Sequence, residues 1–381
     1  MNQLEISKEA LKNNMRSLQL LSPKGAKMRA MVKANAYGVG IEAMVPTLES
    51  LGVIEFGVAT LSEGSELREL LKNSNSRIYI MSGYKEWNAP GMQEVLRVKR
   101  LIPVISSLEE LEAARKLFGD GGGEIELKFN TGMNRLGIDS FRAKECISLL
   151  LAHPELKLIG IGSHLACADS KEVDFTALQS QKFLQILKSF QEAGFRNLES
   201  HLLNSGGLLQ RRTHPELASY TTVVRPGLLL FGIDPREPTQ SQMSEGGTSF
   251  QPVLRWRSSV LEVHEVDKGE GVGYGLSWVG EKKCRVATLP VGYADGFNRR
   301  LSNRGRVLIG EKSYPIVGRV SMDLTTVLVD EGVEPQDEVV LMGRALRGGD
   351  EISVWEIATE CDTIPYEILT SLGSRIQRTL I

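Results

Sequence analysis

Eight short apolar segments rich in β-branched residues recur along the first two-thirds of the chain, and this rhythm constrains the fold most. Stretches with helical spacing separate them, for example residues 108–118 and 175–193. Short strands that alternate with helices indicate parallel βαβ units, and eight such units close naturally into a (β/α)8 barrel of the TIM type. The predicted strands are residues 29–34, 54–60, 77–82, 101–106, 124–130, 157–164, 197–204 and 222–232.

The sequence pattern changes after Gly232. Residues 234–250 read DPREPTQSQMSEGGTSF, which predicts a linker or a long surface loop. Short alternating segments punctuated by glycine then predict a mostly antiparallel β-domain. Its predicted strands are residues 255–266, 284–291, 306–309, 314–320, 325–329 and 338–342.

Two helices are predicted at the end of the chain, over residues 354–360 and 365–378. In the second helix, Thr363 can act as the cap and Pro365 occupies the first turn. We therefore expect an α/β fold with two domains, a barrel over residues 1–235 and a β-domain over residues 236–381.

The charge balance excludes several classes of partner. With 45 basic and 47 acidic residues, the chain has no basic surface for nucleic acid or an anionic membrane. No apolar run approaches the ~20 residues of a membrane span, and the first residues lack the apolar core of a secretory signal. The cysteines are too sparse for a disulfide framework or a metal site: Cys146, Cys167, Cys284 and Cys361. We expect a cytoplasmic protein with reduced thiols, no metal, and no nucleic-acid or membrane partner.

Lys33, in MVKANAYGVG, is the first candidate for chemistry. It lies at the C-terminal end of the first predicted strand, the rim where barrel active sites are found. A lysine in a partly desolvated pocket has a lowered pKa and can attack an aldehyde. A lysine at a strand end is more often a plain surface residue, so the flanking residues decide between the two interpretations.

Those flanking residues carry a resemblance. AMVKANAYGVG is similar to the cofactor-binding segment of alanine racemases, in which the lysine carries pyridoxal 5′-phosphate. Eight further segments resemble racemase segments in the family's order: KFNTGMNRLGI, GSHLACAD, NSGG, VRPGLLLFG, GVGYGLSW, LPVGYADGFNR, VGRVSMDLT and TIPYEI. This resemblance spans nearly the whole chain. It implies an isomerase that interconverts L-alanine and D-alanine with pyridoxal phosphate and supplies D-alanine for peptidoglycan.

The resemblance also implies a phosphate site. Ser205 follows the seventh predicted strand and Gly227 lies in the eighth, the region where barrels usually bind phosphate. Ser205 can donate a hydroxyl, and Gly227 allows close approach of its backbone N–H. In racemases these two positions bind phosphate together with the Leu228 backbone and the hydroxyls of Tyr37 and Tyr366. Taken alone, NSGG would be read as a simple turn.

Arg225 matches the racemase residue that faces the pyridine nitrogen. A guanidinium is a poor proton donor, so the ring nitrogen should stay unprotonated and the ring should be a weaker electron sink than one paired with a carboxylate. The resemblance assigns one base to each face: Lys33 takes the α-proton from D-alanine and Tyr274 takes it from L-alanine. His164 links Tyr274 to Arg225 in the family, which helps a phenol with an ordinary pKa of about 10 to act as a base.

The remaining implied residues bind substrate. Arg135 matches an arginine near the cofactor's phenolic oxygen and the substrate carboxylate, and Met322 and Asp323 match the segment whose backbone reaches that carboxylate. Lys128 matches a lysine that is often carbamylated and then holds Arg135.

Tyr274, Met322 and Asp323 lie in the predicted β-domain, whereas Lys33 lies in the barrel. The resemblance therefore implies a homodimer with shared active sites, in which the β-domain of one subunit completes the barrel site of the other.

Three other functions share part of this pattern. Amino-acid decarboxylases share the barrel-plus-β-domain layout, but should lack Arg225 at this position and need a cysteine-bearing catalytic motif. A broader-specificity racemase is closer, although such enzymes are usually exported. Non-catalytic pyridoxal-phosphate-binding barrels lack a β-domain.

The sequence departs from the family at three positions. Val39 stands where histidine is frequent, Asn130 where aspartate is usual, and Asn134 where glycine is usual. Asn134 directly precedes Arg135, so this change puts the fine geometry of the arginine in question.

Overall fold

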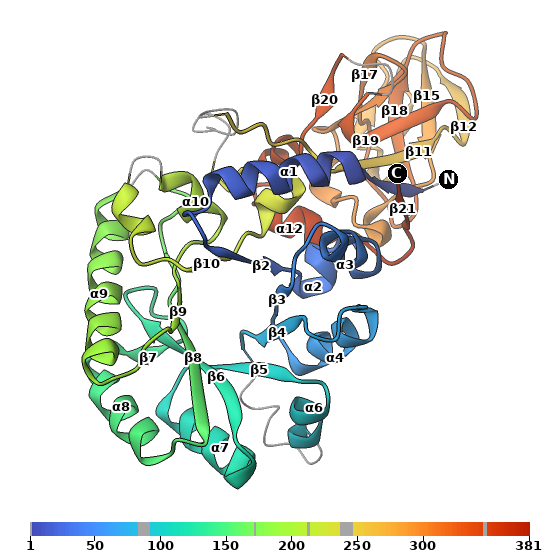
Figure 1. Cartoon of the computed structure of the whole chain (residues 1–381). Helices are drawn as coiled ribbons and strands as arrows, with labels where there is room; N and C mark the ends of the chain where they lie inside the picture. Colours follow the sequence, from blue (N-terminus) through green and yellow to red (C-terminus); the bar gives the residue numbers. More distant parts are fainter. Residues whose placement is uncertain (1, 83–91, 171–172, 212–213, 237–246, 346–348) are drawn as a thin grey trace.

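A computed structural model describes residues 2–82, 92–170, 173–211, 214–236, 247–345 and 349–381. Figure 1 shows a barrel surrounded by helices and, beside it, a separate group of strands. The first and last strands of the chain lie side by side where the two parts meet, because β1 (Gln3–Ile6) pairs in parallel with β21 (Gln377–Leu380). None of the helices in the described ranges is both long and apolar enough to cross a bilayer.

Parallel strands form the barrel, in the order β10-β2-β3-β4-β5-β6-β8-β9. Their bounds are β2 (Lys27–Met31), β3 (Glu55–Val58), β4 (Arg77–Ile80), β5 (Leu101–Ile105), β6 (Gly123–Asn130), β8 (Leu156–Gly162), β9 (Glu199–His201) and β10 (Val223–Val224). A short strand β7 (Ile138–Asp139) pairs with β6. The barrel closes between β9 and β10, where Thr222 N–H donates to Ser200 O at 2.9 Å. Each of the eight predicted segments overlaps one of these strands, so the predicted barrel is confirmed.

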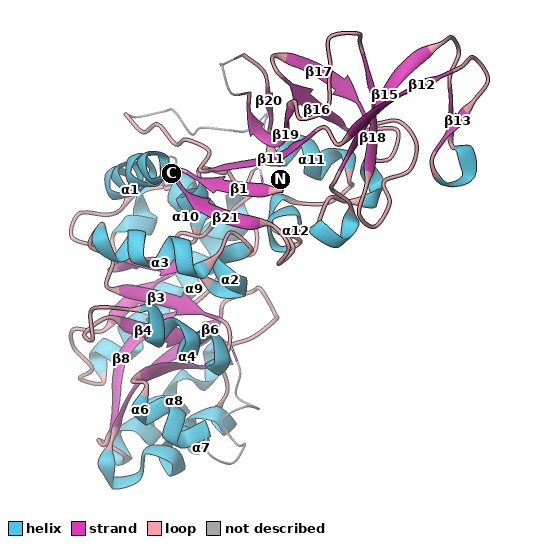
Figure 2. Cartoon of the chain, turned by 90° about the vertical axis from the view of Figure 1, so that its right-hand side faces the viewer, coloured by secondary structure: helices cyan, strands magenta, loops and turns pink. Residues whose placement is uncertain are grey.

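Helices cover the outside of the barrel (Figure 2). They are α1 (Lys8–Leu21), α2 (Lys33–Tyr37), α3 (Ile41–Ser50), α4 (Leu61–Leu70), α6 (Met92–Val98), α7 (Leu108–Phe118), α8 (Ala143–Ala152), α9 (Val173–Glu192) and α10 (Ser205–Gln210). Helix α7 begins where predicted because the Ser107 hydroxyl accepts a hydrogen bond from Glu110 N–H at 3.1 Å. The other predicted helix, over residues 175–193, is α9.

The second part of the chain is mostly antiparallel, as predicted. One sheet has the order β17-β16-β19-β11-β1-β21 with β20 on β19, and a smaller sheet has the order β12-β15-β18. The bounds are β11 (Leu254–Ser259), β12 (Glu262–Val266), β13 (Gly271–Val272), β14 (Trp278–Val279), β15 (Cys284–Leu289), β16 (Arg306–Ile309), β17 (Lys312–Pro315), β18 (Thr325–Val329), β19 (Glu338–Arg344) and β20 (Glu351–Ile352). Helices α11 (Val354–Glu360) and α12 (Pro365–Thr370) follow.

The structure corrects several predicted boundaries. The predicted strand 255–266 is two strands, because Val260 N–H pairs with Asp337 whereas Leu261 N–H pairs with Thr288 in the other sheet. The predicted strand 314–320 is β17, which begins earlier, after a tight turn in which Gly310 has a φ of 61°, and already ends at Pro315. A single division at residue 235 also leaves β1 on the barrel side, although its partners are β11 and β21.

The last predicted helix is too long. Helix 354–360 is found as α11, but α12 stops at Thr370 and Arg378 lies in β21. The chain turns because Gly373 packs against the 294–295 backbone, where a Cβ would lie 2.9 Å from Ala294 O. Pro365 occupies the first turn as predicted, whereas the Thr363 hydroxyl contacts the Glu367 carboxylate and caps no backbone group. Most of the predicted linker, residues 237–246, lies outside the described residues.

Candidate active site

A cavity of about 550 Å³ lies at the C-terminal ends of the barrel strands. Nine of the predicted site residues line it: Lys33, Tyr37, Lys128, Arg135, His164, Ser205, Arg225, Gly227 and Tyr366. Tyr366 comes from α12, so the segment after the β-domain supplies part of the wall.

Lys33 opens α2, two residues after β2 ends. The three residues that follow it have left-handed φ angles of 52–54°, a backbone conformation that costs non-glycine residues roughly 1–2 kcal/mol each. The Glu63 carboxylate braces this turn by accepting from Ala34 N–H and Ala59 N–H, both at 2.7 Å. Sequence analysis missed Glu63, although the Thr60-x-x-Glu63 spacing at the start of α4 signals a polar cap.

The cavity is strongly cationic. Burial lowers the pKa of the Lys33 amine, and the nearby Arg135 guanidinium lowers it further. Burial, followed by Arg225 and Arg135, lowers the pKa of Lys128 to about 8. Burial and then Arg225 lower the pKa of His164 to about 2, so its imidazole is neutral. Both lysines therefore lose their protons more readily than exposed lysines do.

Arg225 is held by four acceptors. One terminal nitrogen donates to His201 Nδ1 and, at 3.0 Å, to His201 O. The other donates to Ser163 O at 2.8 Å and faces His164 Nδ1 at 3.3 Å. Among the described residues, the Nε–H of Arg225 has no acceptor, which leaves it available to a ligand. Burial, and then the Arg29 charge, lower the pKa of Arg225 to about 10.

Hydroxyl groups lie beside the backbone of Gly227 on one wall of the same cavity. Ser205 Oγ accepts from Gly227 N–H at 2.9 Å, and the Tyr37 and Tyr366 rings lie 6.0 Å apart between centroids. A Cβ on Gly227 would lie 2.5 Å from the Tyr37 hydroxyl oxygen, so only glycine fits. The buried Leu228 follows at once. This wall could hold a phosphate group.

Asn134 adopts the backbone conformation that the turn before Arg135 requires. Its φ is 54°, a left-handed conformation that asparagine tolerates better than most residues. The Asn130 side-chain oxygen accepts from Gly132 N–H at 3.1 Å and Asn134 N–H at 3.0 Å. The departures at these two positions are therefore compatible with a well-formed loop, and Val39 is fully buried.

The predicted residues of the β-domain lie apart from the cavity of their own chain. Tyr274 is 72% exposed in a short 3₁₀ helix (Tyr274–Leu276), and Met322 is 51% exposed. A Cβ on Gly275 would lie 3.5 Å from the Arg319 guanidinium, so the segments that hold Tyr274 and Met322 are neighbours. The structure thus brings the barrel residues together and leaves these two on a surface.

Asp323 lies on the same β-domain segment as Met322. Its carboxylate forms an ion pair with Arg375 at 2.6 Å. With the carboxylate already paired, the backbone N–H is the part of this residue suited to a substrate anion.

Comparison with known proteins agrees with these features. Residues 6–235 match the family described as alanine racemase, N-terminal domain, and residues 253–380 match alanine racemase, C-terminal domain. An alanine racemase of Sorangium cellulosum is 35% identical over 98% of this chain and 97% of its own length. The crystal structure of alanine racemase from E. faecalis has a TM-score of 0.88 at 28% identity, covering 100% of this chain and 98% of its own. Alanine racemase from Bartonella henselae with covalently bound pyridoxal phosphate has a TM-score of 0.85 at 29% identity, covering 100% and 99%. Because the two domain matches span most of its length, the chain belongs to the alanine racemase family.

Proposed function

We propose that this protein interconverts L-alanine and D-alanine, using pyridoxal phosphate held covalently on Lys33. The observation that carries the proposal is the single cavity in which the Lys33 amine, the hydroxyl-lined wall and Arg225 meet. The named activity of the S. cellulosum relative and the covalent cofactor of the B. henselae enzyme support it.

The residues of the cavity fit this cofactor. Gly227, Ser205 and Tyr37 would hold its phosphate, because the absence of a Cβ on Gly227 lets the Tyr37 and Ser205 hydroxyls lie together against the backbone. The Nε–H of Arg225 would face the ring nitrogen. When bound, the cofactor supplies an electron sink for the carbanion at the substrate α-carbon. Arg225 does not readily give up a proton, so the ring nitrogen would stay unprotonated and the ring would be a weaker electron sink. Return of the proton to the α-carbon is then favoured over side reactions.

Two bases would handle the α-proton, one on each face. The lowered pKa of Lys33 favours a neutral amine, which takes the proton from D-alanine. Tyr274 takes the proton from L-alanine on the other face. For that role its hydroxyl must lie near His164 and Arg225, and a tyrosine exposed on the β-domain can do so from a second subunit.

Arg135 and the backbone of Met322 and Asp323 would bind the substrate carboxylate. Arg135 and Lys128 lie together as two cations, and within the described parts of the chain Arg135 has no hydrogen-bonded partner. Carbamylation of Lys128 would replace this repulsion with an anion that accepts from Arg135. The pKa of about 8 favours it, because only the neutral amine reacts with carbon dioxide.

The active unit would be a homodimer with shared sites. Apolar side chains are exposed at the cavity mouth, with Leu136 at 44% and Ile364 at 54%, and also on the β-domain, where Tyr274 and Leu276 are 72% and 62% exposed. A two-fold, head-to-tail arrangement would cover both surfaces and bring Tyr274 to the neighbouring barrel. We place the enzyme in the cytoplasm, and its four unpaired cysteines suit a reducing compartment.

Chemical trapping tests this proposal. Borohydride reduction of the cofactor-loaded protein should attach the cofactor to the peptide that contains Lys33. The chirality of several amino acids, followed with purified protein, should change fastest for alanine. Labelling of another lysine would contradict the site, and faster turnover of another amino acid would contradict the substrate.

A further inference from the structure

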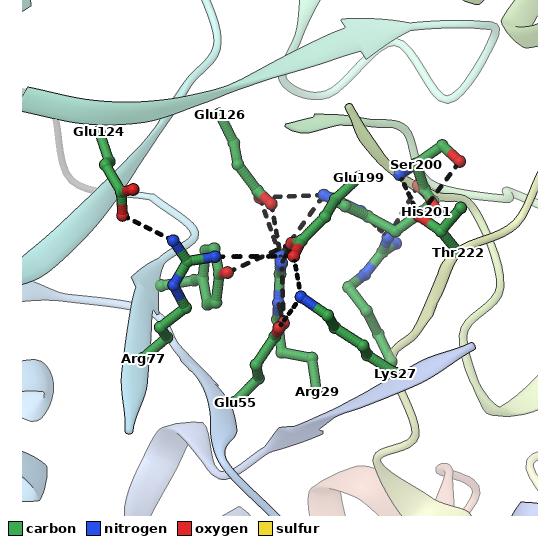
Figure 3. Close-up of polar contacts among 12 residues, drawn as sticks. Lys27, Arg29, Glu55, Arg77, Glu124, Glu126, Glu199, Ser200, His201 and Thr222 are labelled. Atoms are coloured by element: carbon green, nitrogen blue, oxygen red, sulfur yellow. Dashed lines mark hydrogen bonds and ion pairs between the residues drawn. The ribbon is translucent and has the colours of Figure 1, made fainter. Parts of the chain in front are cut away.

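A charged cluster occupies the barrel interior beneath the cavity, on the side where the strands begin. Figure 3 shows the carboxylates of Glu55, Glu126 and Glu199 around Arg29, with His201 beside Glu126. Arg29 and Glu126 are fully buried, and two hydrogen bonds of 2.8 and 2.7 Å join them. Barrel interiors are usually filled by branched apolar residues, and a buried ion pair is often no more stable than an apolar replacement. Stability alone therefore does not explain these five residues, which we call the barrel-floor cluster.

His201 connects this cluster to the active site. Its Nε2 lies 3.0 Å from Glu126 Oε2, and its Nδ1 contacts a terminal nitrogen of Arg225. A guanidinium only donates hydrogen bonds, so Nδ1 must accept. Burial lowers the pKa of His201 to about 4, so the ring is neutral and carries one proton. That proton therefore lies on Nε2 and is donated to Glu126.

The strand between them leaves room for this contact. Strand β8 carries glycine at two inward positions, Gly160 and Gly162. A Cβ on Gly162 would overlap the His201 ring, and a Cβ on Gly160 would lie 2.7 Å from Glu126 Oε1. Glycine at both positions therefore leaves the space that the Glu126–His201 pair occupies.

We propose that Glu126 is a positioning residue for Arg225 and acts through His201. The inference rests on the proposed function, in which Arg225 faces the ring nitrogen of the cofactor. His201 supplies two of the four acceptors that hold the Arg225 guanidinium. Glu126 selects the imidazole tautomer whose Nδ1 can accept. Without that carboxylate, Nδ1 would carry the proton in part of the molecules, and its N–H would then face an N–H of Arg225. Arg225 would lose this acceptor and would be free to turn its Nε–H away from the ring.

Arg29 offers the main competing contact. Its terminal nitrogen lies 3.4 Å from His201 Nε2, and a hydrogen bond there would require the opposite tautomer. That nitrogen is 2.8 Å from the Glu126 carboxylate, the closer acceptor. The nitrogen of His201 that carries the proton therefore distinguishes a hydrogen bond to Glu126 from a hydrogen bond with Arg29.

Substitution of Glu126 by Gln tests the proposal, with Glu55→Gln as the matched control. Glu55 approaches Arg29 at 3.3 Å, as Glu126 does at 2.7 Å, and among the described residues it has no contact with His201. In cofactor-free protein, ¹⁵N NMR should show His201 protonated at Nε2 in the wild type and in Glu55→Gln. Glu126→Gln should populate the Nδ1-protonated form, because a glutamine amide can donate to Nε2 as well as accept from it.

The loaded enzyme supplies the second readout. With cofactor labelled with ¹⁵N at the ring nitrogen, Glu126→Gln should shift that resonance and lower kcat by about 10-fold, the lower end of losses seen for outer-shell partners of metal-bound histidines. Cofactor loading should stay complete. Glu55→Gln should leave the resonance in place. Equal shifts in both variants, or a shift in neither, would overturn the proposal.

A double-mutant cycle tests whether Glu126 acts through His201. Asparagine at position 201 can present an acceptor to Arg225 without any tautomer, so Glu126→Gln should add no further resonance shift in the His201→Asn background. A further shift as large as that in the wild type would contradict the pathway. If Glu126→Gln does not fold, Glu126→Asp retracts the carboxylate and allows the same comparison. Labelling of a lysine other than Lys33 would refute the proposed function alone, since the cofactor-free tautomer still tests the Glu126–His201 contact.

Discussion

The two regions that hold the predicted catalytic groups differ in how complete they are. In the barrel, Lys33, Arg225 and His164 lie in one cavity, and their neighbours in the same chain hold them in place. On the β-domain, Tyr274 is 72% exposed and does not line the cavity that holds Lys33. Folding of one subunit thus forms a cofactor site, whereas the second base, Tyr274, needs the cavity of another subunit in order to act. We expect cofactor binding to depend on the cavity of one subunit, including Tyr366 of α12, and turnover to depend on Tyr274 of the β-domain as well.

Loss of Lys33 should have the largest effect. Lys33→Ala removes both the covalent attachment and one base, so racemisation should fall by about 10⁴-fold in both directions. Polarimetry gives the rate, and the visible absorbance of the bound cofactor should change at the same time. Lys24→Ala, at an exposed lysine before β2, should retain both properties. Retention of reducible cofactor by Lys33→Ala would show that the barrel site is not organised around this residue.

Loss of the Tyr274 hydroxyl should have a smaller and one-sided effect. Tyr274→Phe should lower racemisation by about 10²- to 10³-fold, the usual contribution of a general base. Thermal stability and cofactor absorbance should not change, because the substitution keeps the aromatic ring and removes only one hydroxyl. Exchange of the α-proton with deuterated solvent should suffer more from L-alanine than from D-alanine, which Lys33 still serves. Equal residual exchange from the two enantiomers would refute the division between the two bases.

Carbamylation of Lys128 should give the smallest effect. Enzyme stripped of carbon dioxide should regain about 10-fold activity when bicarbonate is added, an outer-shell contribution through Arg135. The pKa of Lys128 is lowered to about 8, so the neutral amine forms as the pH rises through that value. At an equal concentration of dissolved carbon dioxide, reactivation should therefore be faster at pH 9 than at pH 7. Lys128→Met should not respond to bicarbonate at either pH, and a wild-type rate independent of pH would contradict the modification.

Local patterns in the sequence predicted much of this molecule. Short apolar segments predicted the barrel strands, and ordered motifs predicted nine of the residues that line the cavity, from Lys33 to Tyr366. Contacts between distant segments were not predictable in this way. The pairing of β1 with β21 joins the two ends of the chain, and no local pattern marks it.

Missed residues share the same cause. Glu126 and His201 lie in strands that were predicted correctly, but their roles come from partners on other strands. Glu63 lies outside the named predicted segments and accepts from Ala34 N–H of a distant segment. The overlong final helix has a long-range cause as well, because the chain turns where Gly373 meets the backbone of residues 294–295.

Subunit mixing tests the central claim, that the two regions of one active site come from different subunits. Lys33→Ala and Tyr274→Phe proteins are each nearly inactive, and a mixed dimer of the two has one site with both defects and one intact site. After subunit exchange between equal amounts, activity should rise to about a quarter of the wild-type value, since half of randomly paired dimers are mixed. Exchange is verified independently with two differently tagged subunits. Activity that stays at the level of the separate variants, despite verified exchange, would show that Lys33 and Tyr274 act within one chain.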